Sequence, residues 1–366
     1  AAEGDVVEAS PTAVTWWPGS SVTVRYHVRV DGGALHGWRD MVAVAGRIPD
    51  GAAVVEADGE KVGVWVVPHD PALPGLEAAV DPDRTRRLLT DLGAEDGPVR
   101  VKMRAYRPGR RAVVSVDGLS ERIFLKVVRP KKVEELHENH KFLAARLPVP
   151  HSLGFSAETG MMALQAMPGL TLREVLEVPE LALPAPEAVA GLAASLPAPP
   201  TDKVSKSLIE RAPALAAMLG RVVPNHAGRI EEFVDRLGED DDQDLVPVHG
   251  DFYESQLLVD NGELVGLIDV DTYGLGRAGD DPGVMLGHLA LWQTMSAQPA
   301  RVNEFARSLL SIWDVTHDPS DIRRRAAATL FSLATGPFRV QTADWPGETV
   351  NRIEMAHAWL ASAQEA

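Results

Sequence analysis

Hydrophobic and polar residues alternate in the first part of the chain as β-strands require. Residues 21–30 alternate throughout, and residues 62–67 form a second apolar run that a proline closes. A period of two puts successive side chains on opposite faces of a sheet. An Asp-Pro pair begins a helix expected over residues 81–92, with Gly93 just after its end. Residues 1–95 are therefore expected to form a small N-terminal module.

A second β-rich region follows, with a basic turn between its first two strands. Strands are expected over residues 99–106, 112–116 and 122–128, then a helix over 132–146 and a last strand over 161–167. The pattern then becomes helical, beginning with a capping box at residues 171–174. Residues 239–244 are expected to form a solvated acidic turn. The predicted organisation is a β-rich lobe at 96–169 and a helical lobe at 170–366.

The segment 248–269 carries the most chemistry. Two apolar strands flank the tripeptide Asp-Asn-Gly at 260–262, which is a strong hairpin signal. Because a hairpin folds back on itself, Asp269 is expected to return to the neighbourhood of Gln256. One oxygen ligand from each residue is what Mg²⁺ bound to phosphates requires. Asp251 is then available to orient or deprotonate a hydroxyl group.

These motifs resemble the aminoglycoside phosphotransferase and small-molecule kinase family. The chain has His-Gly-Asp at 249–251, an amide five residues after the aspartate, and Ile-Asp after the hairpin. The family usually has Asn at the amide position, and Gln256 is similar to the maltokinase and glucosamine-kinase branch. The resemblance covers roughly residues 99–366.

The resemblance implies an α+β, bilobal protein-kinase-like fold, with a β-rich N-lobe, a helical C-lobe and residues 1–95 as an extra N-terminal module. It also implies ATP and Mg²⁺ as cofactors. Asp251 is then the catalytic base, and Gln256 and Asp269 are the metal ligands. ATP is expected between the two lobes, and a small hydroxylated acceptor is expected to bind among the C-terminal helices.

Lys126 lies in the middle of an apolar strand, where a lysine needs a reason. Such a lysine either faces solvent from an edge strand or binds the phosphates of ATP. Its place between a basic hairpin and an acidic helix favours the phosphate role. Glu135 is the favoured ion-pair partner for Lys126, with Glu138 next.

Two further segments are candidates for nucleotide contacts. The turn at residues 107–111 holds one glycine and three arginines, so Arg110 or Arg111 could bind phosphate or simply form a solvated tip. The segment that contains Gln165 and Met167 resembles the family's hinge, where backbone groups of these two residues would meet adenine.

The motifs allow two other interpretations. Residues 274–279 match Gly-x-Gly-x-x-Gly, but no βαβ unit is predicted around them, so a dinucleotide site is rejected. His249 could instead be a metal ligand with Asp251 and Asp269 in a hydrolase. No second histidine lies nearby at ligand spacing. The kinase-like fold makes His249 structural.

Composition sets the wider limits. The formal charge of −16 argues against a general nucleic-acid surface, and the absence of cysteine excludes disulfides. No run reaches the about 18 apolar residues that span a bilayer. The N-terminus shows no apolar signal core, so a cytoplasmic protein without a membrane segment is expected. The oligomeric state is not predicted.

The sequence therefore predicts an ATP-dependent kinase of a sugar, an amino sugar or an aminoglycoside. Acids expected near the cleft favour a cationic acceptor slightly, unless they brace the metal and the loops; they are Glu254, Asp271, Asp280 and Asp281. The alternative is a non-catalytic, kinase-like nucleotide-binding protein, suggested by Gln256 and the arginine-rich turn.

Overall fold

The computed structural model describes residues 4–92, 97–240 and 244–366, which form two compact units. The first unit comprises Ala1–Lys141, His151–Ala166 and Phe338–Thr342, and the second comprises Phe142–Pro150, Met167–Pro337 and Ala343–Ala366. The N-terminal module and the β-rich lobe belong to the same unit, so a separate domain ending at residue 95 stays a prediction.

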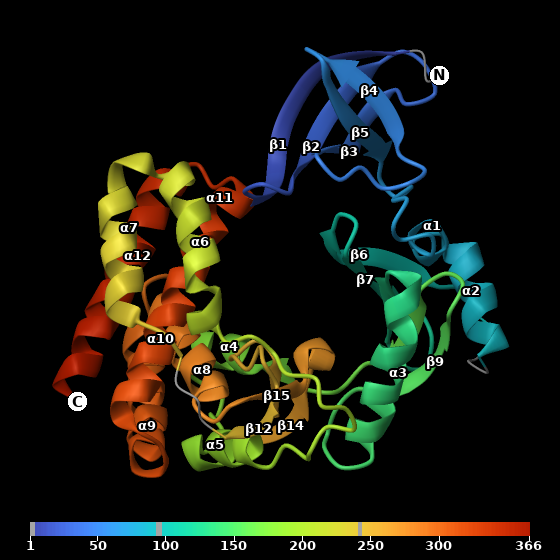
Figure 1. The fold of residues 1–366 in the computed structure, drawn as a ribbon. Coiled ribbons are helices and arrows are strands. Elements are labelled where there is room, and N and C mark those ends of the chain that lie inside the picture. Colours follow the sequence, from blue (N-terminus) through green and yellow to red (C-terminus); the bar gives the residue numbers. More distant parts are fainter. Residues whose placement is uncertain (1–3, 93–96, 241–243) are drawn as a thin grey trace. The chain divides into compact units, whose positions relative to one another are not determined.

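The N-terminal part of the first unit is an antiparallel sheet in the order β1-β2-β3-β5-β4 (Figure 1). Its strands are β1 (Asp5–Trp17), β2 (Ser21–Asp31), β3 (Gly37–Ala45), β4 (Ala53–Ala57) and β5 (Glu60–Val66). The two strands predicted here are confirmed as β2 and β5. Two helices follow, α1 (Leu76–Ala79) and α2 (Pro82–Asp91). Asp81 caps α2 as expected, accepting from the amide of Arg84 at 2.9 Å, whereas Gly93 lies outside the described residues.

The second sheet of this unit has the order β6-β7-β8-β10-β9 and carries helices on both faces. Its elements are β6 (Arg100–Arg107), β7 (Arg111–Asp117), β8 (Ile123–Val128), α3 (Pro130–Ala144), β9 (Ser152–Ser156) and β10 (Met161–Gln165). Alternate residues such as Val114 and Leu125 pack against α1 and α2. Val128 and Met162 on the opposite face pack against α3. The predicted strands and helix are confirmed in order, although β9 was not expected and β10 ends two residues earlier than expected.

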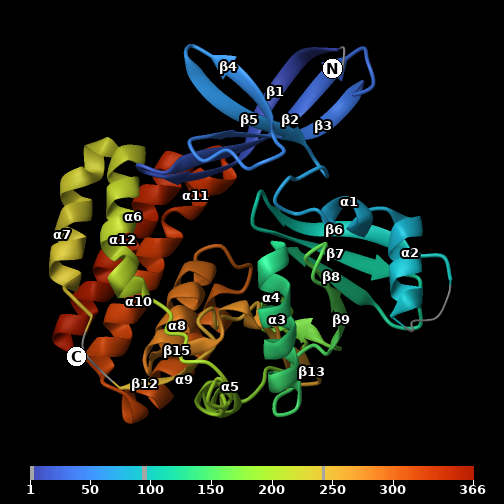
Figure 2. The ribbon, with the colours of Figure 1, turned by 45° about the vertical axis from the view of Figure 1, so that its right-hand side comes forward.

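The second unit is mainly helical. Its helices are α4 (Leu172–Glu177), α5 (Pro186–Ala194), α6 (Leu208–Val222), η1 (Pro224–His226), α7 (Ala227–Leu237), η2 (Val270–Thr272), α8 (Asp280–Gln293), α9 (Pro299–Thr316), α10 (Pro319–Leu333) and α12 (Trp345–Glu365), while α11 (Gly336–Val340) is shared with the first unit. The predicted capping box begins α4. Both views show α6, α7, α10 and α12 packed side by side (Figures 1 and 2).

Two small sheets lie among these helices and carry the segment with the motifs. One has the order β11-β13-β14, and the other pairs β12 with β15. Their strands are β11 (Leu170–Thr171), β12 (Leu245–Val248), β13 (Leu257–Asp260), β14 (Glu263–Leu267) and β15 (Gly274–Arg277). Leu257 and Leu267 are completely buried in the main core of the unit. No helix in the described part of the chain is long and apolar enough to cross a membrane.

Candidate active site

The predicted hairpin is formed by β13 and β14. Asn261 and Gly262 join the strands with φ values of 49° and 82°, and positive φ at both positions is typical of the two-residue type I′ turn. The amide of Ile268 donates to the carbonyl of Gln256 at 2.9 Å. The residue before Asp269 therefore lies beside Gln256, as the hairpin argument predicts.

Asp251 and Asp269 both lie near Tyr253 in the second unit, and the backbone of Gln256 is bonded to the residue before Asp269. Burial raises the pKa of Tyr253 to about 12, and the negative charges of Asp251, Glu254 and Asp269 add to this rise. Asp251 and Asp269 thus act on the same phenol ring. Gln256 is 5 % exposed. Oxygen donors from an amide and a carboxylate fit Mg²⁺, which prefers a few protein oxygens together with phosphate oxygens.

Asp269 has a backbone conformation that few residues other than glycine adopt. Its φ of 58° and ψ of 48° are left-handed. This conformation ends β14 abruptly and begins the short helix η2. Non-glycine residues in such conformations cluster at functional sites. The observation supports a functional role for Asp269, while its contact with a metal stays a prediction.

His249 is a structural residue of this segment. Its Nε2 donates to the carbonyl of Ile268 at 3.0 Å, and its carbonyl accepts from the hydroxyl of Thr272 at 2.8 Å. Complete burial lowers the pKa of His249, which keeps the ring neutral. Among the residues that the structure describes, no group of three or more His, Asp or Glu side chains is arranged to hold a metal. The described residues therefore offer no ligand set of the kind that the hydrolase interpretation requires.

Asp281 braces the loop that carries Asp251. Its two carboxylate oxygens accept from the amide of His249 at 2.7 Å and from the amide of Gly250 at 2.9 Å. Gly250 has φ 77°, a conformation that suits glycine. Burial raises the pKa of Asp281 to about 7, and the two amide donors oppose that rise. Asp281 therefore bonds to the loop directly, as the alternative bracing role of the acids predicts.

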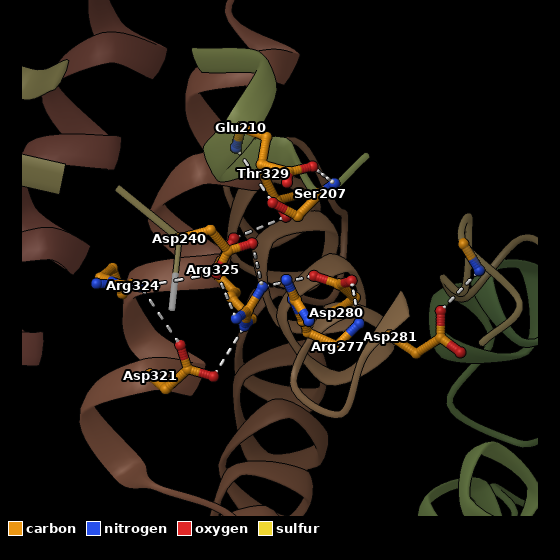
Figure 3. A network of polar contacts seen from close by, with 11 residues as sticks. Ser207, Glu210, Asp240, Arg277, Asp280, Asp281, Asp321, Arg324, Arg325 and Thr329 are labelled. Carbon is orange, nitrogen blue, oxygen red and sulfur yellow. Dashed lines mark hydrogen bonds and ion pairs between the residues drawn. The ribbon is translucent and has the colours of Figure 1, made fainter. Parts of the chain in front are cut away.

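A buried ion network stands behind this brace (Figure 3). Arg325 on α10 is 3 % exposed and binds Asp240 at 2.7 Å, Asp280 at 2.7 Å and Asp321 at 2.8 Å. Arg324 adds a second cation, 3.8 Å from Asp240. The expectation of a solvated turn was wrong for Asp240, because an arginine on a distant helix neutralises it. Residues 241–243 lie outside the described part of the chain.

Sequence reasoning missed Arg325. It is the third of three consecutive arginines, which look like a solvated helix surface. The only available signal is its helical phase. Arg325 follows the buried residue Ile322 by three positions and precedes Ala326, so it falls on the buried face of α10.

Three of the four acids proposed to attract a cationic acceptor are committed to the protein. Glu254 is completely buried and paired with Arg173 on α4. Asp280 binds Arg325, and Asp281 binds the loop amides. It was therefore wrong to expect these three carboxylates to attract a cationic acceptor. The stated alternative, in which the acids brace the loops, describes them better.

Lys126 lies inside the second sheet of the first unit. It is 5 % exposed, and β8 is flanked by β7 and β10, so the solvent-facing edge alternative is wrong. Lys126 pairs with Met162 of β10, which packs against α3, and the lysine therefore shares the face that α3 covers. On α3, Glu138 is exposed and bound to Lys141 at 3.1 Å. Glu135 is half-buried and is itself bound to Lys132 at 3.1 Å, so its pairing with Lys126 stays a prediction.

The basic turn after β6 is well defined. The amide of Arg110 donates to the carbonyl of Arg107 at 3.0 Å, and Gly109 has φ 66°. Proline before such a glycine is the signature of a type II turn. Arg110 is exposed and Arg111 is half-buried. A phosphate role for either arginine stays a prediction.

The predicted hinge coincides with a boundary between the units, which falls between Ala166 and Met167. The amide of Gln165 donates to the carbonyl of His151 at 2.9 Å, and its side-chain amide donates to Glu121. The amide of Gln165 is therefore already occupied. A contact of Gln165 or Met167 with adenine stays a prediction that rests on their other backbone groups.

The glycine-rich match at residues 274–279 is not a dinucleotide site. β15 runs antiparallel to β12 in a two-stranded sheet, and α8 follows directly. A dinucleotide fingerprint needs a parallel βαβ unit instead. The rejection of this motif is confirmed.

Several solved structures share this fold. A thermostable mutant of aminoglycoside phosphotransferase APH(4)-Ia in its apo form is 17% identical, with a TM-score of 0.54 over 76% of this chain and 98% of its own. The same enzyme in complex with AMP-PNP and hygromycin B is 16% identical, with a TM-score of 0.53 over 75% and 98%. A protein described as an aminoglycoside phosphotransferase from Ralstonia eutropha is 13% identical, with a TM-score of 0.52 over 78% and 99%. These likenesses show the kinase-like fold and no more.

The family is shown by sequence. No curated protein matches the chain. The profile described as "Phosphotransferase enzyme family" matches residues 103–324, which is more than half of the chain. The match includes Lys126 and the whole segment from His249 to Asp281. This chain therefore belongs to the phosphotransferase enzyme family.

Proposed function

We propose that this protein is an ATP- and Mg²⁺-dependent kinase that phosphorylates a hydroxyl of a small molecule. The observation that carries the proposal is the way in which residues 249–281, called the catalytic segment below, are held in place. Asp251 lies in a loop whose backbone is held by Asp281 and by the buried ring of His249. Asp269, in its left-handed conformation, returns to Gln256 at the end of the same hairpin. The APH(4)-Ia complex with AMP-PNP supports ATP as the donor.

Each residue has one role in this proposal. Asp251 orients the acceptor hydroxyl and takes its proton as the bond to phosphorus forms. Gln256 and Asp269 hold Mg²⁺, which would neutralise charge on the phosphates when bound. Lys126 binds the phosphates and is oriented by Glu135, whereas Arg110 and Arg111 add guanidinium contacts.

A sugar, an amino sugar or an aminoglycoside is the proposed acceptor class. The complex of APH(4)-Ia with hygromycin B supports a hydroxyl-rich acceptor. A strong preference for cations is not part of the proposal, because Glu254, Asp280 and Asp281 are bound by the protein itself. We expect matched neutral and amino sugars to differ by less than about tenfold in kcat/KM, which corresponds to about 1.4 kcal/mol.

ADP release across a panel of sugars, amino sugars and aminoglycosides tests this function. Acceptor-dependent release that Asp251→Asn abolishes would establish the kinase. The alternative, a nucleotide-binding protein without transfer, is favoured by Gln256 at the usual Asn position. Binding of ATP without ADP release for any acceptor would support that alternative.

The metal role has its own test. Asp269→Ala is expected to abolish Mg²⁺-dependent ATP binding, whereas Gln256→Asn is expected to keep partial activity because it restores the usual family ligand. Glu263→Gln, an exposed change on the same hairpin, is the control. Calorimetry that finds tight Mg-ATP binding to Asp269→Ala would remove Asp269 from the metal site.

A further inference from the structure

A single buried carboxylate links the N-terminal module to the basic turn. Asp70, between β5 and α1, is 3 % exposed. Its Oδ2 accepts from the amide of Gly109 at 2.7 Å and from the hydroxyl of Tyr106 at 2.8 Å. Its Oδ1 accepts from the amide of Ala72 at 2.9 Å. Both carboxylate oxygens of Asp70 are therefore bonded, and two of the three donors come from the tip of the β6–β7 hairpin.

The amide that Asp70 accepts decides the shape of the turn. In a type II turn the closing bond joins the first and fourth residues, here Arg107 and Arg110. The amide of Gly109 belongs to the central peptide group and takes no part in that bond. Rotation of the central peptide would convert the turn to type I and reverse the direction of this amide. A carboxylate that accepts the Gly109 amide therefore favours type II over type I.

The same glycine is held from its other side. The Nε of Arg129 donates to the carbonyl of Gly109 at 2.7 Å. Arg129 directly follows β8, the strand that carries Lys126. Hydrogen bonds with one ionised partner are about twice as strong as neutral ones. Gly109 thus has charge-assisted bonds to both of its backbone polar groups, one from the N-terminal module and one from the lysine strand.

A buried tryptophan completes the link. The Nε1 of Trp65 on β5 donates to the hydroxyl oxygen of Tyr106 at 3.0 Å. With that oxygen occupied as an acceptor, the Tyr106 proton is directed to Asp70. Burial and the charge of Asp70 raise the pKa of Tyr106, so the phenol keeps this proton. Trp65 therefore donates to Tyr106, and Tyr106 donates to the Asp70 carboxylate.

We propose that Asp70 is a positioning residue for nucleotide binding. It holds the central peptide of the turn in the orientation that presents Arg110 and Arg111 to the phosphates of ATP. The N-terminal module therefore contributes to ATP affinity through this turn, with no contact between Asp70 and the nucleotide. The proposal rests on the proposed kinase function.

The test compares Asp70→Ala with Glu60→Gln, which removes an exposed carboxylate from β5 of the same module. Mg-ATP affinity is measured by calorimetry, and hydrogen exchange is measured at the Gly109 amide. Asp70→Ala is expected to weaken ATP binding about tenfold, since it removes charge-assisted bonds, and to expose the Gly109 amide to exchange. The acceptor KM should stay unchanged, and Glu60→Gln should match the wild type in every measurement.

The outcomes separate this inference from the proposed function. If the wild type binds no Mg-ATP, the proposed function fails, and fast exchange at Gly109 in the wild type would also overturn the brace. If the wild type binds ATP and Asp70→Ala binds it equally well, the inference is overturned alone. A merely structural role would lower stability and weaken acceptor and ATP binding together.

Two milder variants cover the case in which Asp70→Ala does not fold. Asp70→Asn keeps the shape and one acceptor oxygen, and it should weaken ATP binding by a few-fold. Tyr106→Phe removes one donor but leaves the Gly109 bond, so its ATP affinity should fall less than that of Asp70→Asn. The opposite order of these two variants would overturn the inference.

Discussion

The catalytic segment of the second unit and the basic turn of the first unit differ in burial. The catalytic segment is buried, and His249 and Gln256 both have less than a tenth of their surface exposed. Some of its bonds are local and join His249 to Ile268 and Ile268 to Gln256. Asp281 on α8 also accepts from the amides of His249 and Gly250, which are 32 and 31 residues away. The turn is a half-exposed hairpin tip instead, and its central residue is bonded by Asp70 and Arg129, which are 39 and 20 residues away.

This difference in burial predicts how each region responds when a supporting residue is removed. Removing a support of the catalytic segment leaves buried polar groups without partners, which costs folding free energy. Removing a support of the turn frees the half-exposed peptide group of Gly109, which water can reach. Loss of the buried Asp70 also leaves the hydroxyl of Tyr106 without its acceptor, so some cost in stability is expected there too. Changes behind the catalytic segment should therefore lower stability, and changes behind the turn should lower ligand affinity.

Asp251→Asn is the change expected to have the largest effect. Loss of a positioned base is expected to lower kcat by about 10²–10⁴, while Mg-ATP affinity stays close to that of the wild type. Steady-state kinetics and calorimetry measure the two quantities. Glu263→Gln on the same hairpin should change neither. Near wild-type turnover by Asp251→Asn would end the assignment of Asp251 as the base.

Arg325→Met tests the support behind the catalytic segment. The change leaves three carboxylates without their shared cation, and breaking a buried ion pair in this way costs about 3–5 kcal/mol. Arg323→Met on the same helix is the matched control. Arg323 binds Asp314 through two bonds of 2.6 and 2.7 Å at a half-buried site, so its loss should cost only about 1 kcal/mol. Equal losses in urea unfolding would contradict the contrast between a buried brace and a peripheral pair.

Much of the fold and of the catalytic segment could be predicted because the signals are local. The Asn-Gly turn fixes the hairpin, and the hairpin returns Asp269 to Gln256. Hydrophobic patterning located β2 and β5 of the first sheet and four strands of the second, but it missed β1, β3, β4 and β9. The roles of Asp70 and Arg325 could not be predicted, because their partners are distant in sequence. The same limit explains the error about Asp240, since an acidic run looks solvated until its buried cation is known.

Lys126→Met tests the proposed binding of ATP phosphates by the first unit. The isosteric change should lower Mg-ATP affinity by about 10- to 100-fold, since a hydrogen bond from a charged group contributes about 1.5–3 kcal/mol. Stability should change little by comparison with Arg325→Met. Calorimetry and urea unfolding measure both. A large loss of stability with unchanged ATP affinity would reverse the contrast drawn between the two regions.

Two glutamates on α3 sharpen the same test. Glu135→Gln should weaken ATP binding by a few-fold, because the proposed partner of Lys126 loses its charge. Glu138→Gln should have no effect, since Glu138 is exposed beside Lys141. The two changes remove the same charge from the same helix, so they differ only in position. An effect of Glu138→Gln alone would show that the partner was assigned wrongly.

A last expected effect is a dependence of stability on pH near the catalytic segment. His288 stacks on Tyr253, with ring centroids 4.0 Å apart. Burial, and then the charge of Arg173, lower the pKa of His288 to about 3. The unfolded chain takes up this proton near its ordinary pKa of about 6.5, so stability is complete above that pH and falls at lower pH.

His288→Phe keeps a stacking ring and removes the titrating group. At pH 5.5, one pH unit below the ordinary pKa, the wild type should have lost about 1.4 kcal/mol through His288 relative to pH 7.5. Urea unfolding at both pH values should therefore show a smaller acid-dependent loss for His288→Phe. The exposed residue His36, changed to Phe, is the control and should keep the wild-type loss. An equal loss in all three proteins would show that His288 is not kept neutral, and that the surroundings of Tyr253 are more open to solvent than the contrast with the basic turn requires.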